Sequence, residues 1–287
     1  MKCRLLLALG AAGCALVLSF LSAAEATSLR DVAYREGVPE PKLDFFFPSE
    51  KGFPTVVHVY GSGWRSGSGK SSIPVAEALQ RHGVGCVLVS HRLAPGHPIA
   101  DQAEDVAAAF AWAKAHVTES GGDPKRLFLC GHSTGGHLAA LVAVDPKYLS
   151  PYHLGARDIS GLIGLSAPVD LTLHADGQGY GNMMSGPRGR GVFPSTSEEI
   201  LSLSPLHQAK QMPRRVLLLD GSEDFPMLAK DAQAFAAKAR ELGADVSSEV
   251  VPGKDHMGMI RALTVESDPV FLRVLAFVQG DANGVKH

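Results

Sequence analysis

Short apolar runs rich in β-branched residues recur along this chain, and alanine-rich stretches with helical spacing separate most of them. The runs are 55–60, 85–90, 126–130, 159–165, 216–220 and 246–251, and examples of the stretches between them are 99–116 and 227–242. Strands that alternate with helices form a mainly parallel sheet that carries helices on both faces. The pattern therefore predicts an α/β fold with its functional loops at the carboxyl ends of the strands.

The chain has 287 residues, and no internal repeat or linker divides residues 27–287. One large domain over that range is therefore expected. Its first part, up to about Phe53, is predicted to add edge strands through the run 43–47. Near the end, Ser267-Asp268-Pro269 predicts a helix start in which serine is the N-cap and proline the first helical residue.

Residues 1–26 have the layout of a secretory signal peptide. Lys2 and Arg4 give a basic start, residues 5–23 are apolar, and the Ala-Glu-Ala at 24–26 fits a cleavage site. We expect the mature chain to begin at Thr27 and the protein to be secreted or periplasmic. An uncleaved membrane anchor is the alternative, because the apolar run is close to the ~20 residues that span a bilayer.

Charge and cysteine content exclude several classes of protein. The 27 basic residues are balanced by 29 acidic ones, which argues against a nucleic-acid binder. Four cysteines in a chain of this length are no disulfide scaffold, and the absence of a Cys-x-x-Cys or Cys/His cluster argues against a metal site. Cys86 and Cys130 fall within apolar strands, so each is expected to be a buried free thiol.

A predicted strand at 126–130 runs directly into Gly131-His132-Ser133-Thr134-Gly135, and a helix-like stretch at 136–144 follows. This is the context of a nucleophile elbow, in which a sharp turn lifts a serine hydroxyl clear of the sheet. Side chains at 131 and 135 would collide with the neighbouring strand and helix, which explains the two glycines. The alternative is an ordinary serine in a glycine-rich helix cap.

A serine hydroxyl needs a base to become a nucleophile, and the base needs an acid to orient it. After the run 216–220 comes a turn that ends in Glu223 and Asp224, and after the run 246–251 comes a loop with His256. The order Ser133, Asp224, His256 is the order that this kind of fold uses. Three other carboxylates remain as alternatives to Asp224, namely Asp220, Glu223 and Asp170.

From about residue 34 to 260, the chain resembles the α/β-hydrolases of the carboxylesterase and hormone-sensitive-lipase-like group. The likeness rests on the elbow, Asp224 and His256, together with Leu43-Asp44, Tyr60-Gly61-Ser62-Gly63-Trp64, His91-Arg92-Leu93-Ala94-Pro95, Gly136-His137-Leu138 and Ser204-Pro205-Leu206. The resemblance implies a serine hydrolase that cleaves carboxylic esters and needs no cofactor or metal. Some members of the group act on aryl formamides instead.

The same resemblance assigns roles to individual residues. Ser133 becomes the nucleophile, His256 the base and Asp224 the acid, and the oxyanion hole would be formed by the backbone N–H groups of Ser62, Gly63 and Thr134. Trp64 either forms the floor of the substrate pocket or only packs against neighbouring side chains. The family usually has His-Gly-Gly-Gly-Trp where this chain has Tyr60-Gly61-Ser62-Gly63-Trp64, and a serine resists a positive φ where glycine does not.

Two glycine-rich segments each allow more than one interpretation. Residues 61–71 are similar in sequence to a phosphate-binding loop. The first glycine that such a loop requires is replaced by Trp64, so a phosphate-binding loop is not predicted here. Residues 176–195 contain six glycines and form either a short lid over the pocket or a plain surface loop. Without a large cap, small or medium-sized soluble esters are the expected substrates.

The leading hypothesis is therefore a secreted ester hydrolase whose partner is a small-molecule ester. An aryl-formamidase on the same machinery is the close alternative. The third is a catalytically silent hydrolase fold that binds a ligand, which the unusual turn at 60–64 motivates. The sequence carries no signal for an oligomeric state.

Overall fold

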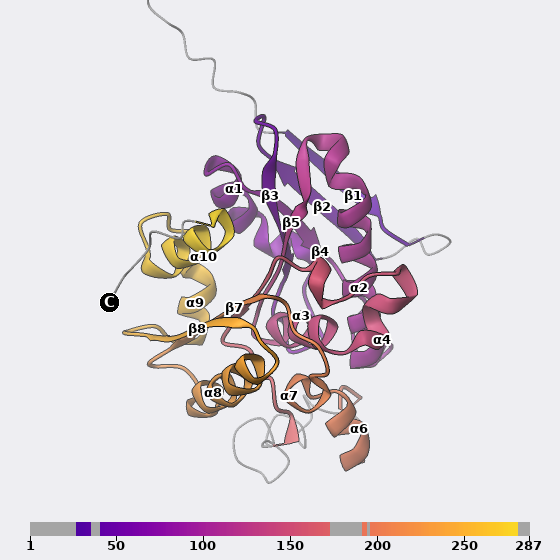
Figure 1. The fold of residues 1–287 in the computed structure, drawn as a ribbon, viewed down its shortest axis with the longest axis vertical. Helices are drawn as coiled ribbons and strands as arrows, with labels where there is room; N and C mark the ends of the chain where they lie inside the picture. The colour runs from indigo at the N-terminus through magenta and orange to yellow at the C-terminus, as the bar shows by residue number, and fades with distance from the viewer. Residues whose placement is uncertain (1–26, 36–40, 173–190, 194–195, 281–287) are drawn as a thin grey trace, which may run out of the picture.

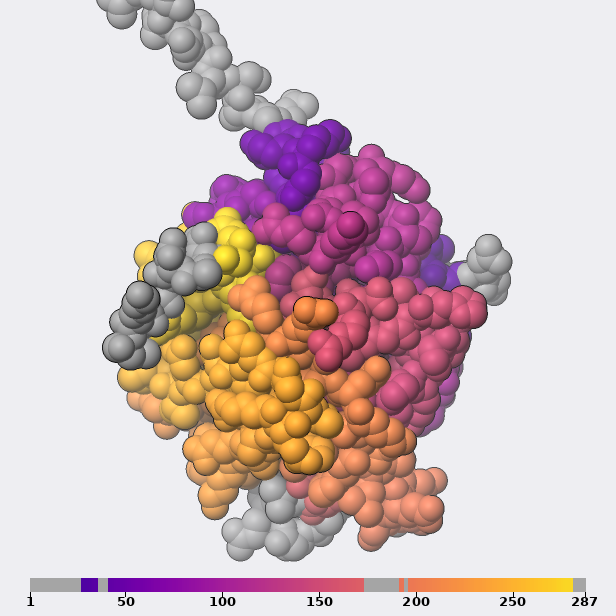
Figure 2. All heavy atoms as spheres, viewed as in Figure 1, coloured from indigo at the N-terminus to yellow at the C-terminus, as the bar shows by residue number. Residues whose placement is uncertain are grey.

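The computed structural model describes residues 27–35, 41–172, 191–193 and 196–280. The leader predicted at 1–26 and most of the glycine-rich segment 176–195 lie outside the described residues. In the space-filling view, the first and second halves of the described chain meet along a continuous surface (Figure 2). Within the described residues, no helix is both long enough and apolar enough to cross a bilayer.

One sheet of eight strands, with the order β1-β2-β4-β3-β5-β6-β7-β8, runs through the molecule. The pairs β1–β2 and β2–β4 are antiparallel, and all later neighbours are parallel. The strands are β1 (Thr27–Ala33), β2 (Lys42–Phe47), β3 (Phe53–Val59), β4 (Gly85–Val89), β5 (Gly122–His132), β6 (Gly161–Leu165), β7 (Arg215–Gly221) and β8 (Asp245–Val251). The predicted edge strands are therefore confirmed as β1 and β2.

Helices cover both faces of this sheet. They are α1 (Ile73–Arg81), α2 (Ile99–His116), α3 (Thr134–Val144), α4 (Pro146–Leu149), α6 (Ser197–Ser202), α7 (Pro205–Gln208), α8 (Pro226–Glu241), α9 (His256–Ala262) and α10 (Pro269–Gln279). Short 3-10 turns lie at Gly69–Ser72, Val117–Ser120, Ser150–Tyr152 and Ala156–Asp158. Figure 1 shows α1, α9 and α10 together at the left of the view and α2 and α4 at its right.

Two apolar cores follow from the alternation of side chains along the strands. Val57 of β3 packs in the core shared with α2, α3 and α8, whereas the neighbouring Val56 packs in the core shared with α1, α9 and α10. The same alternation holds in β7, where Leu218 faces one core and Leu219 the other. Because successive side chains of a strand point to opposite faces, a continuous apolar run is what a doubly covered strand requires.

Most of the predicted elements are confirmed, and one local prediction is wrong. The helix predicted at 99–116 is α2, and the helix predicted at 227–242 lies one residue earlier, as α8. The N-cap of α10 is Asp268 and not Ser267, because Pro269 occupies the first helical position and the Asp268 carboxylate accepts a hydrogen bond from the Val270 N–H. Cys86 and Cys130 are buried free thiols, as expected.

Candidate active site

Ser133 stands in the turn between β5 and α3, at the carboxyl end of the sheet. Its backbone has φ 53° and ψ −126°, a positive φ that residues other than glycine rarely adopt. The chain can turn this sharply because two glycines flank the turn. A Cβ atom at Gly131 would lie 2.4 Å from the Gly135 carbonyl carbon, and one at Gly135 would lie 2.2 Å from the Val59 oxygen. The elbow predicted from the sequence is therefore present.

Three side chains from separate strand-end segments meet beside this turn. His256 Nε2 lies 2.8 Å from Ser133 Oγ, and His256 Nδ1 lies 2.8 Å from Asp224 Oδ1. The ionised Asp224 can only accept, so Nδ1 carries the hydrogen and Nε2 is left to accept from the serine hydroxyl. The structure thus brings together the three residues that the sequence order singled out.

Asp224 is held as a carboxylate by two side chains. Burial raises the pKa of this group, but hydrogen bonds from His256 and Ser166 outweigh that effect and leave the pKa below its usual value. The Ser166 hydroxyl donates to Oδ2 at 2.5 Å, and the Phe225 backbone N–H donates to Oδ1 at 2.7 Å. A carboxylate of this kind can orient the imidazole and stabilise its protonated form.

Among the described residues, His132 inside the elbow has its hydrogen bond with the His256 backbone and not with the Ser133 hydroxyl. Its Nε2 lies 2.9 Å from the backbone oxygen of His256, and the two imidazole rings lie 4.8 Å apart between centroids. Burial lowers the pKa of His132 to about 3, helped by the nearby His256, so this ring is neutral at physiological pH. A carbonyl oxygen only accepts, so Nε2 is the nitrogen that carries the hydrogen. His132 therefore braces the segment that carries the His256 imidazole.

The turn at 60–64 lies against the elbow. The family that the chain resembles usually has a glycine at position 62, yet the positive φ values of this turn fall at other positions. Gly63 has φ 64° and Trp64 has φ 59°, whereas Ser62 is not among the residues with positive φ. The serine is therefore compatible with the backbone of this turn. The Ser62 N–H donates a hydrogen bond of 2.9 Å to Thr134 Oγ1. By contrast, neither the Gly63 nor the Thr134 N–H has a hydrogen-bond partner among the described residues.

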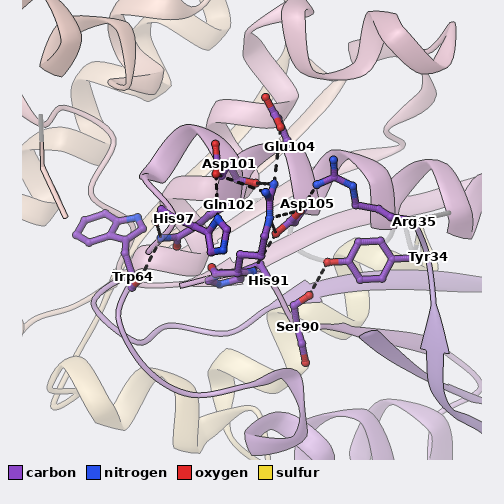
Figure 3. A network of polar contacts seen from close by, with 11 residues as sticks. Tyr34, Arg35, Trp64, Ser90, His91, His97, Asp101, Gln102, Glu104 and Asp105 are labelled. Atoms are coloured by element: carbon purple, nitrogen blue, oxygen red, sulfur yellow. Dashed lines mark hydrogen bonds and ion pairs between the residues drawn. The ribbon is translucent and has the colours of Figure 1, made fainter. Parts of the chain in front are cut away.

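The carbonyl of Trp64 anchors the strained part of this turn. It accepts hydrogen bonds from the Ala94 N–H at 3.0 Å and from Gln102 Nε2 at 3.0 Å. Gln102 is fully buried in α2 and also donates to the His97 oxygen (Figure 3). The indole N–H of Trp64 donates to His137 Nδ1 at 3.3 Å, which ties the turn to α3. These bonds fix a backbone conformation that would otherwise be unfavourable.

An ion-pair network centred on the buried Asp105 holds the 91–97 segment on α2 and so supports the same turn (Figure 3). Asp105 is fully buried and accepts hydrogen bonds from the Arg92 backbone N–H and from Arg92 Nε. Arg35 adds a second guanidinium at Asp105, and Arg92 reaches Asp101 as well. Two arginines at one buried carboxylate supply the partners that a desolvated charge requires.

The alternative acids lie elsewhere. Asp220 is buried near the end of β7, and burial, with the charges of Asp224 and Asp231, raises its pKa to about 7. Glu223 lines a separate polar cavity with Lys254 and Arg261. Asp170 accepts from His207 at 3.1 Å and from Thr172, so it is engaged in another contact. Of the four carboxylates, Asp224 is the one that contacts His256.

A cavity of about 460 Å³ opens above Ser133. Its apolar lining includes Phe225, Met257 and Ile260, and the turn and the elbow line it as well. Ser71 and Ser72 add hydroxyl groups. Trp64 is 1% exposed and is not among the described residues that line the cavity, so its contacts are those of packing. Within the described ranges, no three His, Cys, Asp or Glu side chains are grouped as a metal site would need.

Two residues of this site were missed at the sequence level. Ser166 directly follows the predicted strand 159–165, so its position in the sequence could have indicated a side chain at the carboxyl edge of the sheet, near the site. Gln102 lies within a long helix, and nothing in its local sequence indicates that it reaches Trp64.

The elbow, the strand-end acid and histidine, and the parallel sheet together define the class of protein as an α/β-hydrolase. Comparison with known families gives the particular one. The BD-FAE family model matches residues 43–238, so this chain belongs to the BD-FAE family of α/β-hydrolase esterases.

Individual relatives agree with this membership. Isoprenylcysteine alpha-carbonyl methylesterase ICME of Arabidopsis thaliana is 24% identical over 268 residues, which cover 88% of this chain and 62% of that protein. Carboxylesterase NlhH of Mycobacterium tuberculosis is 36% identical over 120 residues, which cover 40% of this chain and 36% of that protein. The chain spans little more than half the length of the first curated relatives it matches.

Solved structures share the fold over nearly the whole chain. Esterase B from Lactobacillus rhamnosis superposes with a TM-score of 0.72 at 17% identity, covering 90% of this chain and 88% of that one. A truncated carbohydrate esterase from gut microbiota gives a TM-score of 0.70 at 19% identity, covering 90% of this chain and 97% of that one. At these identities the likeness concerns the fold.

Proposed function

We propose that this protein is a serine hydrolase that cleaves carboxylic esters through an acyl-enzyme. The observation that carries the proposal is the continuous chain of contacts from Ser133 through His256 to Asp224, with both hydrogen bonds at 2.8 Å. Acyl transfer by a serine requires a nucleophile in contact with a base and a base in contact with an orienting acid, so these contacts support the proposal. Membership of an esterase family supports the same chemistry.

The reaction would proceed in two halves. His256 Nε2 accepts the hydroxyl proton as Ser133 Oγ attacks the ester carbonyl, and the proton then passes from Nε2 to the leaving alcohol. Water enters, gives a proton to the same nitrogen and attacks the acyl-enzyme. The bond from the acyl carbon to Ser133 Oγ then breaks, the proton passes from Nε2 to Ser133 Oγ, and the acid is released. Asp224 keeps the imidazole in one tautomer and stabilises its charged form in both halves. No step needs a metal or an organic cofactor.

The cavity supports substrates of small or medium size. Its volume of about 460 Å³ suits a compact acyl or alkoxy group. Phe225 lies with its ring centroid 5.0 Å from that of His256, and Met257, which also lines the cavity, is 53% exposed. Because histidine protonates the leaving alcohol, the apolar wall beside His256 favours esters of apolar or aromatic alcohols.

A panel of p-nitrophenyl esters from acetate to dodecanoate tests the proposal. We expect turnover that is highest for short and medium acyl chains and that is lost in Ser133→Ala. A fluorophosphonate probe should label wild-type Ser133 covalently and leave Ser133→Ala unlabelled. A wild type that neither turns over nor labels would establish a silent binding protein, and faster cleavage of an aryl formamide than of the matched ester would establish the formamidase alternative.

We also propose that the protein acts outside the cytoplasm. Support comes from the basic start, apolar run and cleavage-like triplet within residues 1–26. The intact mass of protein recovered from the native host should correspond to a chain that begins at Thr27. A mass that retains the leader, in protein recovered from the membrane fraction, would indicate the anchored alternative.

A further inference from the structure

We propose that the side-chain hydroxyl of Thr134 donates a hydrogen bond to the oxyanion, in the place expected for the Ser62 backbone N–H. The inference rests on the proposed function, because an oxyanion forms only when Ser133 attacks a carbonyl. The family resemblance implies an oxyanion hole made of backbone N–H groups alone, and this proposal adds a side-chain donor to that hole.

The first step concerns the Ser62 N–H, which already has a partner. Its nitrogen lies 2.9 Å from Thr134 Oγ1, a normal hydrogen-bond distance. A backbone N–H has a single proton to donate, so it cannot serve an oxyanion equally well while this bond stands. The donor expected at this position is therefore occupied by the threonine oxygen.

The second step concerns the hydroxyl proton of Thr134. A hydroxyl group has one proton and two lone pairs, and the bond from Ser62 uses one lone pair only. Among the described residues, no acceptor for the Thr134 proton is found. The residue is only 2% exposed, yet it lines the cavity above Ser133. A buried proton without a partner is unfavourable, and the cavity is where an acceptor can reach it.

The third step concerns position. The turn and the elbow are in direct contact, because a Cβ atom at Gly61 would lie 2.6 Å from the His132 oxygen and 2.9 Å from Ser133 Cβ. Thr134 Oγ1 bridges these two segments through its bond to Ser62. His256 contacts the Ser133 hydroxyl at 2.8 Å. A carbonyl attacked by Ser133 must therefore place its oxygen against the turn and the start of α3.

The chemistry of the hydroxyl suits this position. As Ser133 Oγ bonds to the carbonyl carbon, negative charge develops on the carbonyl oxygen, and the Gly63 N–H, the Thr134 N–H and the Thr134 hydroxyl converge on it. The proton stays on Thr134 Oγ1 throughout. The bond received from Ser62 polarises the hydroxyl and makes it a stronger donor. Ser62 then acts as a positioning residue for Thr134.

Substitutions at 134 separate the hydroxyl from the backbone N–H. Thr134→Val keeps the N–H and the shape of the side chain but removes the hydroxyl, so kcat/KM for p-nitrophenyl acetate should fall about 10²-fold, mostly in kcat. Thr134→Ser keeps the hydroxyl and should stay within about threefold of wild type. A trifluoromethyl ketone, which forms an oxyanion on Ser133, should bind Thr134→Val about 10²-fold more weakly.

Wild-type activity in Thr134→Val would overturn the inference. So would a Thr134→Ala enzyme faster than wild type, because the hydroxyl would then merely obstruct the Ser62 N–H. If the valine variant does not fold, Thr134→Cys replaces it, since a thiol is a weak donor, and the expected loss is about tenfold or more. Wild type and Ser133→Ala, assayed in parallel, report on the proposed function separately, and a wild type without turnover refutes both proposals.

Discussion

The hydroxyl group of Ser166 donates a hydrogen bond of 2.5 Å to Oδ2 of Asp224, the carboxylate oxygen that His256 does not contact. Ser166 is fully buried directly after β6, at φ 51°. A bond to a charged acceptor contributes about 1.5–3 kcal/mol. We expect Ser166→Ala to lower kcat about tenfold with little change in KM, because Asp224 loses part of its orientation and charge stabilisation.

Steady-state kinetics on p-nitrophenyl acetate measure this effect. Ser160→Ala is the matched control, because the Ser160 hydroxyl donates to the Lys125 oxygen at an exposed site just before the same strand. The control should retain wild-type kcat. A Ser166→Ala enzyme as fast as the control would show that His256 and the Phe225 N–H hold Asp224 sufficiently without the serine.

Gln102 offers a test of how the turn at 60–64 is held. Its Nε2 donates to the carbonyl oxygens of Trp64 and His97, and Gln102→Met removes both bonds while preserving length and burial. We expect a loss of about 1–3 kcal/mol in unfolding free energy and a fall of about tenfold in kcat. Urea denaturation and kinetics measure the two effects.

The control for this substitution is Gln279→Met, which removes an exposed amide that donates to the His82 oxygen. It should leave kcat unchanged. Wild-type kcat in Gln102→Met, with stability lowered, would mean that the remaining hydrogen bonds, among them the one from the Ala94 N–H, keep the conformation of the turn without Gln102.

Local sequence signals predicted the parts of this molecule that local physics determines. The alternation of apolar runs and alanine-rich stretches gave the parallel sheet, and α2 has the predicted bounds. The glycines at 131 and 135 predicted the elbow. In the structure, a Cβ atom at either position would lie within 2.5 Å of backbone atoms, which is the local reason for the two glycines. Each of these features depends on residues close in sequence or on a pattern with a fixed period.

Contacts between distant segments could not be predicted in the same way. Asp224 and Glu223 are adjacent in one turn, and only the packing of the loops decides which of them meets His256. Thr134 Oγ1 accepts a hydrogen bond from the Ser62 N–H, although 72 positions separate the two residues. The positive φ falls at Gly63 and Trp64, so the serine at 62 is less unusual than its sequence context suggests.

Gly135 tests the packing of the elbow. A Cβ atom there would lie 2.2 Å from the Val59 oxygen and 2.4 Å from the Tyr60 oxygen, both backbone atoms that cannot move aside. Gly135→Ala should therefore destabilise the fold by at least about 3 kcal/mol or yield insoluble protein. Gly96→Ala, whose Cβ would meet nothing closer than 3.9 Å, should melt within a few degrees of wild type. Thermal unfolding measures both, and equal melting temperatures would contradict the close packing.

Asp220 gives the protein a pH-dependent stability whose sign can be worked out. Burial, with the charges of Asp224 and Asp231, raises the pKa of Asp220 from 3.8 to about 7 in the folded chain. The folded state therefore keeps a proton that the unfolded state has already lost, and the associated stability is complete below pH 3.8 and disappears as the pH rises through 7.

Asp220→Asn removes this dependence, because an amide stays neutral at every pH. Each pH unit between the two pKa values is worth about 1.4 kcal/mol, so the variant should exceed wild type in unfolding free energy by a few kcal/mol at pH 8 and match it near pH 4. Urea denaturation at several pH values measures the difference, and Asp123→Asn, near the start of β5, controls for the loss of a distant charge. A stability difference that does not change between pH 4 and pH 8 would mean that Asp220 ionises as readily in the folded chain as in the unfolded one.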